Sequence, residues 1–375
     1  MTSTSVRCTI ETVLCVILSG IGGAVAMEPA CRPTSQSNYE DQSLVIVPCL
    51  NEEAHLTELL TTLLDDPACG KIVVVDGGST DGSKAIVAEV MKRDDRVTLL
   101  NNPKRIQAAG INLAIEAYGT GFEWMTRVDA HCQYPARYIS SLRDAAARTG
   151  ADCVVVPMVT RSRSGCFQTA VAAAQNSVLG TGGSAHRHVS RGAFVAHGHH
   201  ALMRVATFLT AGRYDERFRA NEDAELDLRI TAEGGRIWLE PSAAIIYYPR
   251  DTPWGLLLQY FRYGRGRAMT FLHHRPRLHL RQLLPLAVLP SLLLAVLAPC
   301  LTPENGALSA PAAAWIIAAI AFGAFLGLRE RSRCAAAAGI AAIIMHASWS
   351  TGFWFECVRS SLRRASSVNG SAAQT

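Results

Sequence analysis

A dense group of carboxylates stands in the stretch RANEDAELDLRI, residues 219–230, where Glu222, Asp223, Glu225 and Asp227 follow one another closely. Acidic side chains are favoured in the first turn of a helix because the helix dipole is positive there. The group could instead supply the general base of an enzyme, which needs a carboxylate whose pKa is raised by burial and by a neighbouring like charge. This stretch alone fits both interpretations.

Two further acidic residues follow predicted buried strands. Apolar runs at residues 44–47 and 72–75 are closed by Pro48 and Asp76, and the stretch WMTRVDAH brings a third strand to Asp129. Segments with helical periodicity lie between these runs, which predicts an α/β fold with a Rossmann-like, mostly parallel, doubly wound sheet. Ligands of such sheets bind at the carboxyl ends of the strands, so Asp76 and Asp129 are candidate ligand-binding residues.

The glycine-rich turn DGGSTDG, residues 76–82, does not fit a dinucleotide site. It lacks the G-x-G-x-x-G order, and Asp76 stands where a pyrophosphate needs backbone donors and no anion. A carboxylate at this position can accept hydrogen bonds from a base or a ribose. The phosphates of a nucleotide are then left to a metal ion bound further along the chain.

Charge and hydropathy are unevenly spread along the 375 residues, whose net charge is +5. Residues 43–248 read as an ordinary globular domain, whereas Ala, Leu and Ile dominate from residue 281 onward. Six arginines precede the apolar part: Arg262, Arg265, Arg267, Arg275, Arg277 and Arg281. This placement suits membrane lipids or a phosphate-bearing ligand better than duplex nucleic acid, and the aromatic residues show no stacking pattern for nucleic acid.

The apolar part contains candidate membrane spans. Residues 283–301 and 311–328 carry no charge and are near the length needed to cross a bilayer. Residues 334–355 are also free of Asp, Glu, Lys and Arg, but contain His346 and several Ser and Gly, so this segment could span, re-enter or lie at the interface. If the main domain is cytosolic, the first span exits and the second returns, so the basic stretch RERSR, residues 329–333, lies inside as the positive-inside rule expects. The basic tail after Phe355 does not fit this pattern if the third segment spans fully.

The cysteines and the N-terminus bear on location. The eleven cysteines include no C-x-x-C pair and no zinc spacing, and we interpret them as reduced, which favours a domain facing the cytosol. The apolar stretch TVLCVILSGIGGAVA near the N-terminus could be a weak anchor, a signal peptide or the result of a start codon upstream of a true start at Met27.

Five motifs, taken in order, resemble those of family 2 glycosyltransferases: PCLNEE (48–53), VVVDGGSTDG (73–82), RVDAH (127–131), NED (221–223) and QYFRY (259–263). They extend over about residues 43–267. The D-A-H variant, the stretch HGHHALMR (197–204) and the apolar tail are similar to one subgroup, the membrane-bound glucosyltransferases of succinoglycan-type exopolysaccharide synthesis. We expect HGHH itself to form a flexible loop near the acceptor.

The resemblance implies a GT-A-type domain that binds a nucleotide-sugar. Asp129, and His131 in place of the family's second Asp, match its metal motif and imply Mn²⁺ or Mg²⁺ as a cofactor. The residues expected to bind the donor substrate, a UDP-sugar, are Pro48, Asn51, Glu52, Asp76, Asp81, Arg105, Gln259 and Tyr263.

The catalytic residues implied are Asp223, Glu222 and Arg262. Asp223 matches the family's general base, and we expect burial beside Glu222 to raise its pKa. Arg262 could clamp a phosphate or belong to a basic collar on lipid headgroups. One base without a second carboxylate as nucleophile implies a single displacement with inversion.

Together these features predict an N-terminal apolar segment and linker (1–42), a GT-A domain (43–250), a basic interfacial segment (251–282), two to three transmembrane segments (283–357) and a polar basic tail (358–375). The expected enzyme is a multi-pass cell-membrane protein with a cytoplasmic catalytic domain. It would transfer glucose from UDP-glucose to a polyprenyl-diphosphate-linked acceptor. The alternatives are a processive polysaccharide synthase, disfavoured by Tyr263 in place of Trp and by few membrane segments, and a non-catalytic scaffold that binds nucleotide-sugar, disfavoured by Asp223.

Overall fold

A mixed β-sheet forms the centre of the computed structural model, which describes residues 41–163, 165–181, 191–276, 280–301 and 306–372. The N-terminal apolar stretch lies outside the described residues. In the order β3-β2-β1-β4-β9-β6-β10-β8, the strands are Val97–Asn101, Cys69–Asp76, Ser43–Cys49, Trp124–Arg127, His199–Arg204, Cys153–Val156, Ile237–Leu239 and Ala193–Phe194.

The first four of these strands are parallel to one another, as are β6 and β10. Strand β9 lies antiparallel between β4 and β6, and β8 is antiparallel to β10. A second sheet pairs β5 (Cys132–Gln133), β11 (Ile245–Tyr247) and β7 (Met158–Thr160). The predicted α/β fold with a mostly parallel sheet is confirmed.

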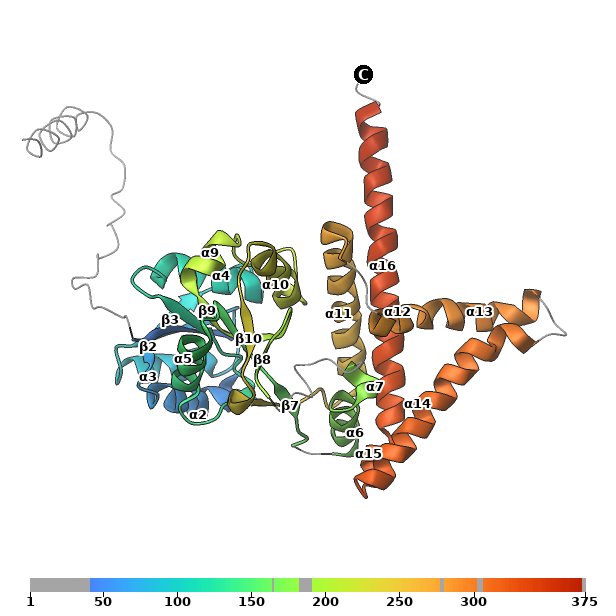
Figure 1. Ribbon diagram of the computed structural model, residues 1–375, viewed down its shortest axis with the longest axis horizontal. Helices are drawn as coiled ribbons and strands as arrows, with labels where there is room; N and C mark the ends of the chain where they lie inside the picture. Colours follow the sequence, from blue (N-terminus) through green and yellow to red (C-terminus); the bar gives the residue numbers. More distant parts are fainter. Residues whose placement is uncertain (1–40, 164, 182–190, 277–279, 302–305, 373–375) are drawn as a thin grey trace, which may run out of the picture. The chain divides into compact units, whose positions relative to one another are not determined.

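Helices cover both faces of the main sheet (Figure 1). On one face, Leu56 and Leu60 of α2 and Ile139 of α5 pack against the strands; on the other, Ile111 of α4 and Leu226 of α10 do so. The helices of this region are α2 Glu53–Leu64, α3 Ser83–Met91, α4 Gln107–Tyr118, α5 Tyr138–Thr149, α9 Val205–Thr210 and α10 Glu222–Ala232, with the 3-10 turn η1 Pro241–Ala243. The alternating strands and helices therefore place all parallel strand ends at one edge.

The remaining helices are α6 Cys166–Gln175, α7 Val178–Thr181, α11 Pro253–His274, α12 Leu280–Leu286, α13 Val288–Leu301, α14 Ala310–Arg329, α15 Arg333–Ala336 and α16 Ala338–Ala372, with η2 Gly306–Ser309. Three segments are long and apolar enough to cross a membrane: Leu283–Cys300, Gly306–Arg329 and Arg333–Arg363. Helix α16 is continuous through most of the segment expected to be a polar tail. The topology of these segments stays a prediction.

One pair of cysteines contradicts the expectation that all are reduced. Cys166 at the start of α6 and Cys334 in α15 form a disulfide, with a Cα–Cα distance of 4.9 Å. The two are separated by 168 residues, so their spacing in the sequence gives no sign of the pairing, which depends on how α6 packs against α15 and α16. Among the described cysteines the others are free. Reduced cysteines therefore no longer support the prediction of a cytosolic domain, because this pair is oxidised.

Small residues let α11 and α16 pack closely. A Cβ at Gly264 of α11 would collide with the carbonyl of Trp349, and one at Gly352 of α16 would collide with the carbonyl of Phe261. The side chain of Arg265 is also ion-paired with Glu356, at 2.8 Å. The contact thus depends on backbones that approach one another without side chains between them.

We predict that Gly264→Ala destabilises the protein by about 1–3 kcal/mol, the usual cost of overpacking a close contact. The thermal midpoint of the detergent-solubilised protein measures this loss. Gly306→Ala is the matched control, because a Cβ at Gly306 meets nothing within 4 Å. Equal midpoints for the two variants would contradict the prediction.

Candidate active site

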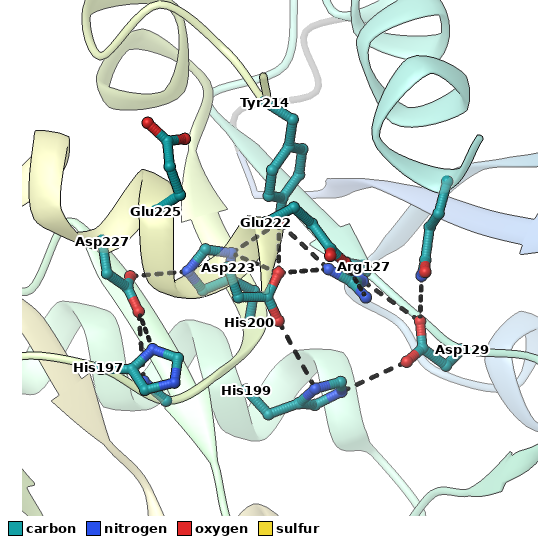
Figure 2. A network of polar contacts seen from close by, with 12 residues as sticks. Arg127, Asp129, His197, His199, His200, Tyr214, Glu222, Asp223, Glu225 and Asp227 are labelled. Atoms are coloured by element: carbon teal, nitrogen blue, oxygen red, sulfur yellow. Dashed lines mark hydrogen bonds and ion pairs between the residues drawn. The ribbon is translucent and has the colours of Figure 1, made fainter. Parts of the chain in front are cut away.

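A single buried arginine joins the ends of two motifs that lie far apart in the chain. Arg127, the last residue of β4, contacts Asp223 Oδ1 through Nη1 at 2.5 Å, Glu222 Oε1 through Nη2 at 3.3 Å and Asp129 Oδ1 through Nε at 3.2 Å (Figure 2). The side chain of Arg127 is 5% exposed, and burial strengthens each contact. The predicted metal residue and both members of the predicted acidic pair therefore lie around one guanidinium.

The acidic stretch of residues 219–230 forms the buried start of a helix. Helix α10 begins at Glu222, and Asn221 before it has left-handed backbone angles, with φ 62° and ψ 20°. Glu222, Glu225 and Asp227 are all buried. The stretch is therefore a first helical turn, as the dipole favours, but it is not a solvated helix face.

The pKa values of the acidic pair differ from the expectation. Burial and the charge of Asp223 raise the pKa of Glu222, although Arg127 opposes them. Burial also raises the pKa of Asp223, but the positive charges of Arg127 and His200 outweigh it, and that pKa lies well below its ordinary value. The expectation that Glu222 raises the pKa of Asp223 is wrong. Arg127 lies closer to Asp223 than to Glu222 and keeps Asp223 ionised. The repulsion between the two carboxylates therefore raises the pKa of Glu222.

Two adjacent histidines of β9 lie against the same carboxylate. His199 stands between Asp129 and Asp223, with Nε2 at 3.7 Å from Asp129 Oδ2 and Nδ1 at 3.9 Å from Asp223 Oδ2. Nδ1 of His200 is 3.3 Å from Asp223 Oδ1 (Figure 2). Burial lowers the pKa of His199, and the charge of Arg127 adds to this effect. The stretch HGHH, expected as a loop, therefore places its last two residues in a strand of the central sheet.

A pocket of about 200 Å³ opens beside Asp129. It brings together five residues predicted to bind donor or metal: Pro48, Glu52, Arg105, Asp129 and His131. The Nδ1 atom of His131 lies 3.1 Å from Glu52 Oε1. Burial lowers the pKa of His131, but the hydrogen bond to Glu52 and the charge of Asp129 outweigh it and raise that pKa.

Three other predicted donor-binding residues form hydrogen bonds within their loops. Asp76 is buried, and its carboxylate accepts hydrogen bonds from the backbone N–H groups of Gly78 and Ser79, both at 3.0 Å. Asp81 accepts from the backbone of Glu53, at 3.1 Å, and Asn51 Oδ1 accepts from that of Thr80, at 2.8 Å. None of the three lines the pocket, although Val75 and Gly77 on either side of Asp76 do, and their role in binding a base or ribose stays a prediction.

Helix α11 carries the last predicted group. Nε2 of Gln259 donates to the hydroxyls of Tyr247, at 2.9 Å, and Tyr263, at 3.0 Å, while its Oε1 is buried and accepts no hydrogen bond from the described residues. The carbonyl of Tyr263 accepts from Asn221 Nδ2 at 2.6 Å, which connects this motif to the start of α10. Arg262 is exposed and forms no ion pair with the described residues, so both of its expected roles stay open.

Comparisons with known proteins identify the family. The sequence model described as Glycosyl transferase family 2 matches residues 44–208. Succinoglycan biosynthesis protein ExoA of Rhizobium meliloti (strain 1021) is 46% identical over 316 residues, which cover 84% of this chain and 94% of that protein. The chain belongs to the family 2 glycosyltransferases. Family membership, together with the site described above, makes it a glycosyltransferase rather than a non-catalytic scaffold.

Two further relatives are more distant. Lipopolysaccharide core biosynthesis glycosyltransferase LpsC of the same organism is 34% identical over 82 residues, 22% of this chain and 28% of that protein. The solved structure of mannosyltransferase PcManGT from Pyrobaculum calidifontis, in complex with GDP-Man and Mn²⁺, has a TM-score of 0.54 and 20% identity. The structural match covers 85% of this chain and 88% of the mannosyltransferase chain. It supports the predicted GT-A-type fold of this family 2 member.

Several residues of the glycosyltransferase site were not predicted from the sequence. Arg127 was given no role, although an arginine at the end of a buried strand is itself unusual because burying a charge requires a partner. Gln107, whose Nε2 donates to Asp129 Oδ1 at 2.9 Å, and Tyr214, whose hydroxyl donates to Asp223 Oδ1 at 3.2 Å, carry no signal in their spacing. Their roles depend on tertiary contacts alone.

The opposite pKa shifts of the acidic pair predict opposite effects on stability. Glu222 has a raised pKa, so its ionised form opposes folding above about pH 4. Glu222→Gln should therefore stabilise the protein at neutral pH, and this gain should vanish as acid protonates the wild-type residue. Asp223 has a lowered pKa, so its stabilising contribution is present above about pH 4 and is lost as the pH falls through the folded-state value.

Asp223→Asn is the matched variant. It should destabilise the protein at neutral pH by about 1.5–3 kcal/mol, the range for a hydrogen bond to a charged group. Thermal midpoints of both variants over a pH series provide the measurement. A loss of stability in Glu222→Gln at neutral pH would show that Glu222 is ionised and paired.

Proposed function

We propose that the protein transfers a single glucose from UDP-glucose, with inversion, to a polyprenyl-diphosphate-linked acceptor in exopolysaccharide biosynthesis. The observation that carries the proposal is the cluster around Arg127, which holds a candidate base and a candidate metal-binding carboxylate on one guanidinium. The similarity to ExoA over 94% of that protein supports the exopolysaccharide class. The candidate membrane spans support an acceptor that is anchored in lipid.

The residues beside the pocket fit a divalent cation. Asp129 offers a carboxylate, whose Oδ2 lies 3.7 Å from His199 Nε2, and His131 offers an imidazole that lines the same pocket. Hard oxygen ligands suit Mg²⁺ and Mn²⁺, and an imidazole suits Mn²⁺ better. A bound ion would neutralise charge on the diphosphate leaving group. Glu52 would orient His131 through their hydrogen bond, and Gln107 and Arg127 would orient Asp129.

Asp223 is the proposed base for the acceptor hydroxyl. Its Oδ1 is held by Arg127 and Tyr214, which leaves Oδ2, on the side of His199, for the hydroxyl. A carboxylate with a lowered pKa stays ionised over the physiological range but accepts a proton weakly. The proton therefore moves as the acceptor oxygen bonds to the anomeric carbon and becomes acidic. With a single displacement, an α-linked donor gives a β-linked product.

The proposed location is the cell membrane, with the catalytic domain in the cytoplasm and the predicted domain boundaries retained. The exposed Arg262 and the other arginines of residues 251–282 would lie near anionic headgroups and the acceptor diphosphate. A non-processive enzyme is favoured over a polysaccharide synthase by Tyr263 in place of Trp and by the finding of three candidate spans among the described residues.

We predict that membranes containing the protein transfer label from UDP-glucose, and not from UDP-galactose or UDP-N-acetylglucosamine, to a lipid that organic solvent extracts. Asp223→Asn should lower kcat by a factor of about 10² to 10⁴, the usual effect of losing a general base, and leave donor affinity nearly intact. Glu222→Gln should change kcat less. Transfer from another donor would refute the choice of sugar, and near-normal turnover of Asp223→Asn would refute the choice of base.

We also predict that Asp129→Ala abolishes the dependence of UDP-sugar binding on Mn²⁺, because its carboxylate is the hard ligand of the motif. Binding titrations with and without the metal measure this, with Glu89→Ala on the surface of α3 as the control. His131→Asp should keep activity and shift the metal preference from Mn²⁺ toward Mg²⁺. Metal-dependent binding that survives in Asp129→Ala would contradict the assignment.

A further inference from the structure

A buried histidine and a buried aspartate lie behind the proposed base. His200 is 2% exposed, and its Nδ1 lies 2.6 Å from the hydroxyl of Tyr214 and 3.3 Å from Asp223 Oδ1. Its Nε2 lies 2.7 Å from Asp227 Oδ1. The imidazole of His200 therefore connects Asp223, at the start of α10, to Asp227 one turn later on the same helix (Figure 2).

Asp227 has no solvent to stabilise its charge. Its side chain is 1% exposed, and its other oxygen, Oδ2, accepts hydrogen bonds from His197 Nδ1 at 2.7 Å and from the backbone N–H of Gly198 at 3.3 Å. A buried carboxylate is stable only when it is paired and hydrogen-bonded. This environment favours an ionised Asp227 with a protonated His200 beside it.

The titration behaviour of the pair agrees with its geometry. Burial lowers the pKa of His200, but the charges of Asp227 and Asp223 outweigh it, and the pKa is raised above its ordinary value. Burial raises the pKa of Asp227, but His200 and His197 outweigh it and lower that pKa. Both shifts stabilise an ion pair.

A metal site is the alternative for the same group. Ligand atoms of Cys153, His200 and Asp227 all lie within 4.8 Å of one another. The direct hydrogen bond between His200 and Asp227, at 2.7 Å, leaves no room for an ion between these two ligands. Without an ion, burial also raises the pKa of the Cys153 thiol well above its ordinary value. The hydrogen-bonded pair is therefore the better description.

We propose that His200, held as an imidazolium by Asp227, is a positioning residue for Asp223: it fixes Oδ1, leaves Oδ2 for the acceptor hydroxyl, and sets the acid limb of the pH profile of transfer. The proposal rests on the proposed function, in which Asp223 is the base. In the transfer step the hydroxyl proton goes to Asp223, the acceptor oxygen bonds to the anomeric carbon, and the diphosphate leaves with the electron pair. His200 neither gives nor takes a proton in this step.

The charged and titratable groups around Asp223 and His200 come from several elements: Arg127 of β4, Asp129 after β4, Cys153 of β6, His197 before β9, His199 of β9, Tyr214 after α9, and Glu222 and Asp227 of α10. Arg127 and His200 are the two groups that approach Asp223 Oδ1 as cations. Replacing His200 removes one of them and leaves the other in place. The effect of His200 can therefore be separated from that of Arg127.

The test is the pH profile of kcat for His200→Gln in the full chain, with saturating Mn²⁺ and with donor affinity measured at each pH. Wild type should keep its turnover through the ordinary carboxylate range near about pH 4. The acid limb of His200→Gln should lie about 1–3 pH units higher, the range for losing an opposite charge next to a carboxylate. Donor affinity should stay near that of wild type.

Two further variants guard the conclusion. The double variant His200→Gln/Asp227→Asn leaves no unpaired carboxylate, so it should fold even if the single variant does not. Its acid limb should also shift upward. Glu225→Gln is the matched control, because Glu225 is a buried carboxylate of the same helix that pairs with Arg229, at 2.6 Å, and His274, at 2.8 Å. Its acid limb should coincide with that of wild type.

The outcomes separate the inference from the proposed function. Unshifted acid limbs in the folded single and double variants would overturn the role of His200. If Asp223→Asn is inactive at the same time, the proposed role of Asp223 as the base is retained. Normal turnover of Asp223→Asn would overturn both. Stoichiometric zinc in the purified protein, lost in His200→Gln, would overturn the ion pair in favour of a metal site.

Discussion

The guanidinium of Arg127 is the interaction on which the site depends. Buried charges are stable only when paired, and this one cation faces the carboxylates of Asp129, Glu222 and Asp223. Separating strand β4 from helix α10 would therefore leave buried charges without a partner. The cluster still holds more anions than cations. In the free protein the raised pKa of Glu222 relieves this excess, and a divalent cation beside Asp129 would relieve it when a nucleotide-sugar is bound.

Strand β9 supplies the other half of the electrostatics. Because it lies antiparallel between β4 and β6, its first residues reach the same edge as the end of β4. His199 then faces Oδ2 of Asp223 and His200 faces Oδ1, so each oxygen has its own imidazole. The two imidazoles differ in pKa, since burial beside Arg127 lowers that of His199, whereas Asp227 raises that of His200. One side of the base is thereby fixed by charge, and the other is left neutral, beside the pocket carboxylate Asp129.

The sequence predicted the sheet and part of the pocket, because these depend on local patterns. Apolar runs closed by Pro48 and Asp76 mark strand ends, and the motifs carry Glu52, Asp129 and His131 to one pocket. Arg105, which lies outside these motifs, lines the same pocket. Residue type alone could not show that the carboxylate of Asp76 also accepts hydrogen bonds from backbone N–H groups. The order of the pKa values in the acidic pair depends on which carboxylate lies nearer to Arg127, and the disulfide depends on helix packing. Spacing along the chain gives neither the distances from Arg127 to the two carboxylates nor the contact between the two cysteines.

The position of Asp223, the proposed base, also depends on the helices of the C-terminal part. Asn221, which precedes α10 in a left-handed conformation, donates to the carbonyl of Tyr263 in α11, and a Cβ at Gly266 would collide with the carbonyl of Ala220. Helix α11 in turn packs on α16 through Gly264 and Gly352. A displacement of α16 would therefore act on α11 first, then on Asn221, and through it on Asp223. The geometry of the proposed base therefore depends on packing between α11 and a candidate membrane helix as well as on the central sheet.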